Sequence, residues 1–310
     1  MQDVFKLVSL LVLTFAVDIS NPAEEEIGFC LFDANSIEPN QYQCNPNPNF
    51  SYSTDPKDLQ SFPELIIPVV FWGINRTDGS HDNALTNTKA SEAVQLLNSA
   101  FEIMNICFEL KDIKQIKDSE IYWTVYYKFN KHIKKNYRVT HKDLNIYVPY
   151  RFTNNNNNLR GGKWSPNQLS VNMLNYNTGI LPHEVGHILG LLHTHTGATA
   201  VNCEHVTRDE NNPDYNAKCA GDRVTDTNAT PKLYGKFHLI NDNCEYEGNL
   251  KNCKGEMYQL TELDVRNFMA YTQHSCRSVF TIGQGIRVRE FIRNSKEKGM
   301  MNFVKKNSSH

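Results

Sequence analysis

The sequence predicts an α+β fold in which a twisted sheet of about five strands packs against a backing helix and a second helix. An irregular, disulfide-linked C-terminal lobe is expected to follow. Three observations predict this fold. Short apolar runs of strand length recur between residues 61 and 175, one segment among them has helical spacing, and the last third is rich in Asn, Asp, Gly and Cys. With 310 residues, 40% of them hydrophobic, the chain can form a substantial core.

The elements are predicted from the spacing of apolar residues. Segment 87–104 places Ala90, Val94, Leu97, Phe101 and Met104 at helical intervals, so we expect it to be the backing helix. Five asparagines at 154–158 cannot pack in a core and indicate a loop. The expected strands are Leu65–Trp72, Ile106–Leu110, Ile121–Phe129, Leu144–Val148 and Gln168–Met173.

The last helix is predicted to begin at Thr281. Residues 281–284 read Thr-Ile-Gly-Gln, a capping-box pattern in which the threonine and the glutamine satisfy each other's backbone N–H groups. Helical spacing after this cap places Ile286, Phe291 and Ile292 on the buried face.

The segment from His183 to His193 reads His-Glu-Val-Gly-His-Ile-Leu-Gly-Leu-Leu-His. On a helix, His183 and His187 are four residues apart, so both imidazoles project from one face toward a single ion. Glu184 lies about 100° around the helix from His183, where it can hydrogen-bond a water on that ion without binding the ion itself. Glycine adopts the left-handed conformation at little cost, so Gly190 should end the helix and let His193 return as the third ligand.

This ligand set predicts a catalytic zinc site. Three neutral imidazoles leave zinc its full double charge and an open fourth position for water, whose pKa falls toward about 7. A purely structural zinc would need a fourth protein ligand, and a gluzincin site would take a downstream glutamate as its third ligand. Pro182 is tolerated only in a first turn, so the helix should begin near Thr178 or Gly179. We expect none of the other histidines nearby or downstream to bind this zinc: His195, His205, His238 and His274.

A second motif, Asn267-Phe268-Met269-Ala270-Tyr271, follows the histidine motif by some 75 residues. Together the two motifs resemble the metzincin metallopeptidases and, within them, the pappalysin family. The resemblance covers about residues 61–295 and implies a metzincin-type catalytic domain. It implies that Met269 forms the methionine turn beneath the zinc, and that Tyr271 polarises the substrate carbonyl or its oxyanion. The chain departs from the family at His195, where an aromatic is usual, and at Asn228, where a proline is usual.

The same resemblance has implications for the C-terminal lobe. It implies the disulfides Cys219–Cys253 and Cys244–Cys276, although sequence alone cannot fix a pairing. It also suggests that Asp222 and Asp226 supply oxygen ligands to a structural calcium ion. The alternative is that these two carboxylates stabilise turns.

The N-terminus favours export. Residues 1–17 carry Lys6 and then an apolar run, Leu7–Val17, of the length expected for the hydrophobic region of a signal peptide, while a buried helix is the alternative. Eight cysteines in the chain also favour a secreted protein. No run of 18 apolar residues exists, so we expect no membrane span.

Residues 18–60 form an acidic leader with eight acidic residues and the single base Lys57. Because the whole chain has a net charge of −2, residues 61–310 carry about +5. An acidic leader before a basic body suggests a pro-segment that docks until it is removed. Cys30 and Cys44 either form a disulfide or place one thiolate on the zinc as a cysteine switch.

The predicted function is that of a secreted zinc endopeptidase whose catalytic domain spans residues 61–310. Glu184 is expected to act as general base toward the attacking water, on protein or peptide substrates. The alternative is a catalytically silent, secreted binding protein on the same scaffold. The small net charge predicts no nucleic-acid partner, and we expect a monomer.

Overall fold

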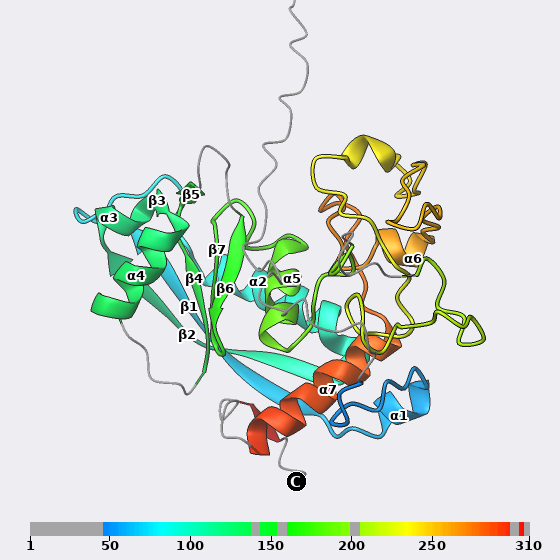
Figure 1. The fold of residues 1–310 in the computed structure, drawn as a ribbon. Helices are drawn as coiled ribbons and strands as arrows, with labels where there is room; N and C mark the ends of the chain where they lie inside the picture. The colour runs from blue at the N-terminus through cyan, green and yellow to red at the C-terminus, as the bar shows by residue number, and fades with distance from the viewer. Residues whose placement is uncertain (1–45, 138–142, 154–159, 199–204, 298–303, 307–310) are drawn as a thin grey trace, which may run out of the picture.

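The computed structural model describes residues 46–137, 143–153, 160–198, 205–297 and 304–306. Helix α5 (Ile180–Ile188), which carries His183 and His187, lies between two parts of the molecule (Figure 1). The sheet and its helices lie on one side of α5, and a lobe with little regular structure lies on the other. The mixed α/β architecture and the irregular C-terminal part agree with the sequence prediction.

The main sheet is mostly parallel. Strands β2, β1, β4 and β7 run parallel to one another, whereas β6 runs antiparallel to β7 at the end of the sheet. The short β8 (Lys305–Lys306) pairs with the start of β1. In spatial order the five longer strands are β2 (Ile106–Lys117), β1 (Leu65–Asn75), β4 (Leu144–Val148), β7 (Gln168–Val171) and β6 (Gly161–Ser165).

Four of the predicted strands are therefore confirmed, and β2 extends seven residues beyond its predicted end at Leu110. Sequence reasoning missed β6, because two glycines and a lysine open it and give no apolar alternation. The predicted loop at residues 154–158 lies outside the described residues.

Helix α2 (Asn87–Phe101) backs the sheet as predicted. The Thr86 side chain caps it by accepting a hydrogen bond from the Lys89 N–H. A 3₁₀ turn, η1 (Glu102–Met104), continues it to the predicted end. Its buried face joins one core with the sheet, α5 and α7 (Ile282–Glu297). The members from α2 are Ala90, Ala93, Val94, Leu97, Ala100 and Phe101.

The prediction of a strand at Ile121–Phe129 is wrong. That stretch forms α3 (Ser119–Tyr122), β3 (Trp123–Val125) and the start of α4 (Tyr126–Asn136). The alternation that suggested a strand put Trp123 and Tyr127 on the buried face, yet these side chains are 54% and 69% exposed. Two local features explain the outcome. The Asp118 side chain caps α3, and Tyr126, Phe129 and Ile133 give α4 an apolar face that packs on Tyr147 and Phe152.

Helix α5 begins and ends where the sequence predicts. Gly179 is its N-cap residue, and Pro182 lies in its first turn, where a missing N–H costs no hydrogen bond. The helix ends at Ile188, and Gly190 has a φ of +93° that turns the chain back toward His193. A Cβ on Gly190 would lie 2.4 Å from the ring of Phe291 on α7, so this position needs glycine for space as well.

The described part of the C-terminal lobe contains little regular structure. Its helices include η2 (Phe237–Leu239) and α6 (Glu262–Val265). A small core in this lobe includes the Cys244–Cys276 disulfide, whose S–S distance is 2.08 Å. Cys219 and Cys253 are also disulfide-bonded, and their pairing with each other stays a prediction. Cys107 is a free thiol.

Helix α7 (Ile282–Glu297) leads from this lobe back to the sheet, and its capping box is confirmed. The Gln284 N–H donates to the Thr281 hydroxyl at 3.1 Å, and the Thr281 N–H donates to Gln284 Oε1 at 3.0 Å. Ile286 and Ile292 are buried, and Phe291 packs against the core from a partly buried position.

The last part of the acidic leader packs on α7. This part contains α1 (Pro56–Gln60), whose Leu59 is 3% exposed. The Ser51 N–H donates to the Glu290 carboxylate at 3.1 Å, and the Asn294 amide donates to the Asn49 carbonyl at 2.9 Å. Residues 46–60 therefore pack against the body, as expected of a leader that docks, and the leader's boundary at residue 60 stays a prediction.

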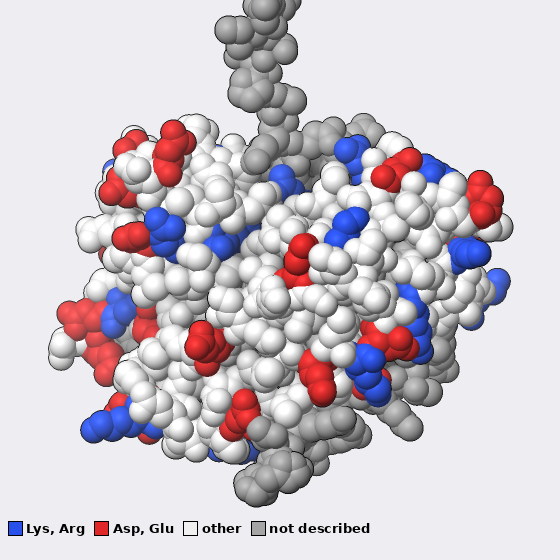
Figure 2. Space-filling view, turned by 180° about the vertical axis from the view of Figure 1, so that it is seen from behind, with Lys and Arg blue, Asp and Glu red and all other residues white. Residues whose placement is uncertain are grey.

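Basic and acidic side chains are interspersed over the face shown in Figure 2, and neither sign forms a continuous field there. Among the helices of the described ranges, none is both long and apolar enough to cross a lipid bilayer.

Candidate metal centre

The structure brings the three predicted histidines together. The Nε2 atoms of His183, His187 and His193 lie 3.0–3.2 Å from one another. Four tetrahedral ligands at zinc distances of about 2.0–2.1 Å are roughly 3.3 Å apart, so this triangle has nearly the size of one face of a zinc tetrahedron. All three imidazoles are at most 2% exposed.

Backbone carbonyls fix the protonation of two of the rings. Nδ1 of His183 donates to the Phe268 carbonyl at 2.6 Å, and Nδ1 of His187 donates to the Leu191 carbonyl at 2.9 Å. A carbonyl can only accept, so each proton is on Nδ1 and each Nε2 bears a lone pair. The Nε2 lone pairs of His183 and His187 therefore face each other and cannot hydrogen-bond to one another, whereas a cation between them satisfies both. The residues present therefore fit a zinc ion.

Burial keeps these imidazoles in the form that binds a metal. It lowers the pKa of His187 to about 3 and the pKa values of His183 and His193 well below the ordinary range. The rings are consequently neutral around pH 7, as coordination requires.

Glu184 is fully buried beside this triangle. Strand β6 approaches it closely, because a Cβ on Gly161 would lie 3.1 Å from Cγ and Oε1 of Glu184. On the same strand, Lys163 donates to the His187 carbonyl at 2.8 Å. Burial lowers the pKa of Lys163 to about 8, and the nearby Glu184 carboxylate opposes this effect. The edge strand thus supports both Glu184 and the end of α5.

Met269 lies directly under α5. It is fully buried, and the Thr194 N–H donates to its carbonyl at 3.2 Å, next to the third histidine. The side chain of Asn267 accepts from the Met269 N–H at 2.8 Å. Asn267 and Gln284 exchange two amide hydrogen bonds of 2.9 and 3.1 Å, so the cap of α7 also holds this turn.

Gly186, inside the histidine motif, makes room for Met269. A Cβ at position 186 would lie 2.8 Å from the Met269 Sδ atom. We expect Gly186→Ala to lower the free energy of unfolding by about 1–3 kcal/mol, because overpacking forces one of the two segments to move. Thermal unfolding of the single and double variants with Met269→Ala measures the coupling. If the losses of unfolding free energy in the two single variants simply add in Gly186→Ala/Met269→Ala, the two residues are not in direct contact.

Tyr271 lies beside the histidines. The centroid of its ring is 4.5 Å from that of His193 and 6.0 Å from that of His183, and the residue is 7% exposed. His195, where the family usually has an aromatic, stacks on His193 at 4.8 Å and lies 4.4 Å from the Tyr271 ring. His195 thus fills the aromatic position with an imidazole, and it does not join the ligand triangle in the part of the chain that the structure describes.

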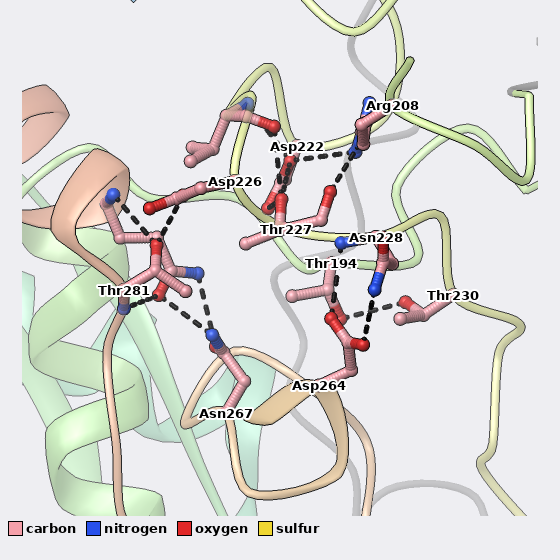
Figure 3. A network of polar contacts seen from close by, with 12 residues as sticks. Thr194, Arg208, Asp222, Asp226, Thr227, Asn228, Thr230, Asp264, Asn267 and Thr281 are labelled. Atoms are coloured by element: carbon pink, nitrogen blue, oxygen red, sulfur yellow. Dashed lines mark hydrogen bonds and ion pairs between the residues drawn. The ribbon is translucent and has the colours of Figure 1, made fainter. Parts of the chain in front are cut away.

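Asp222 and Asp226 do not come together around one point. Asp222 accepts hydrogen bonds from the Val224 N–H and the Thr227 hydroxyl. Asp226 accepts from the Thr281 hydroxyl and the Gly283 N–H, both at 2.7 Å, at the start of α7 (Figure 3). Asp222 therefore stabilises its own turn, as the alternative interpretation expects, whereas Asp226 holds the start of α7, 55 residues further along the chain.

Several residues of the site were not found from the sequence: Gly161, Lys163, Asn267 and Gln284. Each acts through a contact with a residue far away in the chain. Asn267 opens the second motif and Gln284 closes the capping pattern at 281–284, but neither pattern indicated that these two side chains bond to each other beside Met269.

Comparisons with known proteins agree with this geometry. The family model of peptidase family M43, described as pregnancy-associated plasma protein-A, matches residues 127–293, which is more than half of the chain. An extracellular metalloprotease of Neurospora crassa is 24% identical over 245 residues, covering 73% of this chain and 74% of the relative. An extracellular metalloprotease of Sordaria macrospora is 26% identical over 228 residues, covering 67% of each chain.

Among solved structures, metalloproteinase-II of Bacteroides fragilis matches with a TM-score of 0.30 and 12% identity, over 46% of this chain and 52% of that chain. This likeness is too low to support an argument. The names of the two fungal relatives confirm the prediction of an extracellular protein. The chain belongs to the pappalysin metallopeptidases of peptidase family M43, as its motifs, its histidine triangle and the extent of the family match show.

Proposed function

We propose that this protein is a secreted zinc endopeptidase that hydrolyses internal peptide bonds of proteins or peptides. The observation that carries the proposal is the convergence of three buried Nε2 atoms within 3.2 Å of one another, on the helix that also carries the buried Glu184. A site of three histidines leaves a position open for water or substrate, as catalytic zinc sites require.

Zinc bound there would supply a Lewis acid that polarises the scissile carbonyl and brings the pKa of a coordinated water to about 7. Glu184 accepts a proton from the attacking water and passes it to the leaving amine. Its burial and the close approach of Gly161 restrict its carboxylate to one region, so little reorganisation is needed during the reaction. Lys163 places a positive charge nearby, which favours the ionised form of Glu184 that a general base needs.

The substrate is expected to bind as an extended strand along β6. This strand is the end of the sheet and contacts α5, so a peptide paired with it would pass close to the histidines. Backbone hydrogen bonds to an edge strand hold many sequences in one register, as a peptidase requires.

Tyr271 is proposed to stabilise the negative charge that develops on the carbonyl oxygen. We expect Tyr271→Phe to lower kcat by about 10²–10³-fold with a smaller change in KM, because its hydroxyl acts mainly in the transition state. Steady-state cleavage of a fluorogenic peptide measures both constants. Tyr234→Phe is a matched control, since its ring lies 6.4 Å from Tyr271. An unchanged kcat in Tyr271→Phe would remove this residue from the mechanism.

The proposed function is tested by incubating the purified chain with denatured casein and quantifying bound zinc. We expect fragments cut at internal bonds, and cleavage that stops when zinc is chelated. One zinc per chain without cleavage, before and after removal of the leader, would favour a silent binding protein instead.

The same assay tests the pro-segment hypothesis for the acidic leader. A glutamate-specific protease is suitable, because the leader contains four glutamates: Glu24, Glu25, Glu26 and Glu38. A protease that cuts after basic residues would find only Lys57 there. We propose that an activating cut falls before residue 46, since residues 46–60 are anchored to the body.

A further inference from the structure

A buried polar cluster follows the third histidine in the chain, in the loop of residues 221–228 (Figure 3). The carboxylate of Asp222 is 1% exposed. The Thr227 hydroxyl lies 2.9 and 2.8 Å from its two oxygens, and the Val224 N–H donates to it at 3.0 Å. The Thr227 backbone carbonyl belongs to the same cluster. These are carboxylate, hydroxyl and carbonyl oxygens, the ligand types that calcium prefers.

Arg208 occupies the cation position of this cluster. Its Nε donates to the Thr227 carbonyl, and its Nη2 lies 3.6 Å from Asp222 Oδ1. The Arg208 side chain is only 9% exposed. Figure 3 shows the guanidinium pointing at both Asp222 and Thr227 from a separate segment of the chain. A buried carboxylate needs a compensating positive charge, and the guanidinium supplies one here.

A calcium ion does not fit the same oxygens. Calcium needs six to eight oxygen ligands at about 2.3–2.6 Å. An ion shared by the Asp222 carboxylate and the Thr227 carbonyl would meet the guanidinium that already contacts both, and two cations on the same oxygens repel each other. Asp226, the other carboxylate that we considered, is bonded to the start of α7. Among the residues that the structure describes, this cluster therefore fits an arginine and not a calcium ion.

We infer that Arg208 takes the place of a structural cation in this chain, so that the loop after the zinc motif is held without calcium. The loop is connected to the metal centre. Asn228 bonds through its N–H and its amide to Asp264, and the Thr230 hydroxyl donates to Thr194, which follows His193. Arg208 is thus a positioning residue for the segment that returns from the third histidine.

Burial raises the pKa of Asp222 to about 6, and the positive charges of Arg208 and, more weakly, Arg287 act in the opposite direction. Loss of the Arg208 guanidinium would leave only the weaker charge of Arg287, so the buried carboxylate would be held at a higher cost in stability near neutral pH. A variant without the arginine should therefore be less stable, although no residue of the metal centre is changed.

Thermal unfolding of the full chain tests the inference. The chain is passed over a chelating resin, reloaded with one equivalent of zinc, and then unfolded with or without about 5 mM CaCl₂. We expect wild type to unfold at the same temperature in both conditions. Arg208→Gln should lower the unfolding temperature by about 5–10 °C, because a buried ion pair is broken. Arg208→Glu supplies a second carboxylate to the cluster and should gain about 5 °C from calcium but not from magnesium.

Arg266→Gln and Arg266→Glu are the matched controls. Arg266 lies in the same lobe and pairs at 2.6 Å with Glu262, which is 67% exposed, so its loss should shift unfolding by no more than about 2 °C. Stabilisation of wild type by calcium would overturn the inference. So would an Arg208→Gln variant as stable as Arg266→Gln, or a folded Arg208→Glu variant that does not respond to calcium. If Arg208→Glu does not fold, wild type and Arg208→Gln still decide the question.

Discussion

Replacing Glu184 by Gln is expected to leave the metal in place and to lower kcat by roughly 10³–10⁴-fold, the contribution of a well-placed general base. Glutamine has nearly the same shape, and Glu184 is not one of the three residues whose Nε2 atoms converge. The fully buried pocket around Glu184 should therefore keep its packing, including the contact with Gly161. What is lost is the ability to take a proton from water.

Three measurements on Glu184→Gln separate chemistry from structure. Zinc content should stay at that of wild type, the unfolding temperature should change little, and only the rate of peptide cleavage should collapse. Glu102→Gln, on the exposed η1 turn, is the control for a change of one surface carboxylate. Near-normal turnover by a zinc-loaded Glu184→Gln enzyme would remove Glu184 from its proposed role.

Removal of zinc is expected to abolish cleavage and to destabilise the fold. Without the ion, the Nε2 lone pairs of His183 and His187 are buried and face each other at 3.2 Å, because backbone carbonyls hold both rings in that tautomer. A cation between them removes this repulsion, so its loss lowers the stability of the native state.

The size of this effect follows from linkage between binding and folding. Zinc present at about a thousand times its dissociation constant stabilises the native state by about 4 kcal/mol. For a domain of this size, we expect the unfolding temperature to fall by about 8 °C after chelation and to recover when zinc is returned. Equal stability of the zinc-free and zinc-loaded protein would show that the three histidines do not bind the ion tightly.

The candidate site was predictable from the sequence to the extent that it is local. His183 and His187 are one helical turn apart, and Gly190 turns the chain so that His193 can return, all within eleven residues. Met269 and Tyr271 needed the resemblance to a family, because nothing in their own spacing indicates that they lie beneath or beside those histidines.

Contacts between distant segments were not predictable. Lys163 and Gly161 reach the site through β6, a strand without apolar alternation. The Asp222 carboxylate suggested a calcium ligand, and only the fold shows that Arg208 lies against it. At Ile121–Phe129 a true alternation of apolar residues predicted a strand, but the cap at Asp118 and the helical spacing of Tyr126, Phe129 and Ile133 determined the structure.

The most direct test of the central claim is a zinc titration of the metal-free protein, with casein cleavage followed at each step. The account predicts that activity rises linearly and stops rising at one zinc per chain, and that Glu184→Gln binds the same single equivalent without gaining activity. Cleavage by the metal-free protein, or activity that needs no zinc at the three histidines, would contradict it.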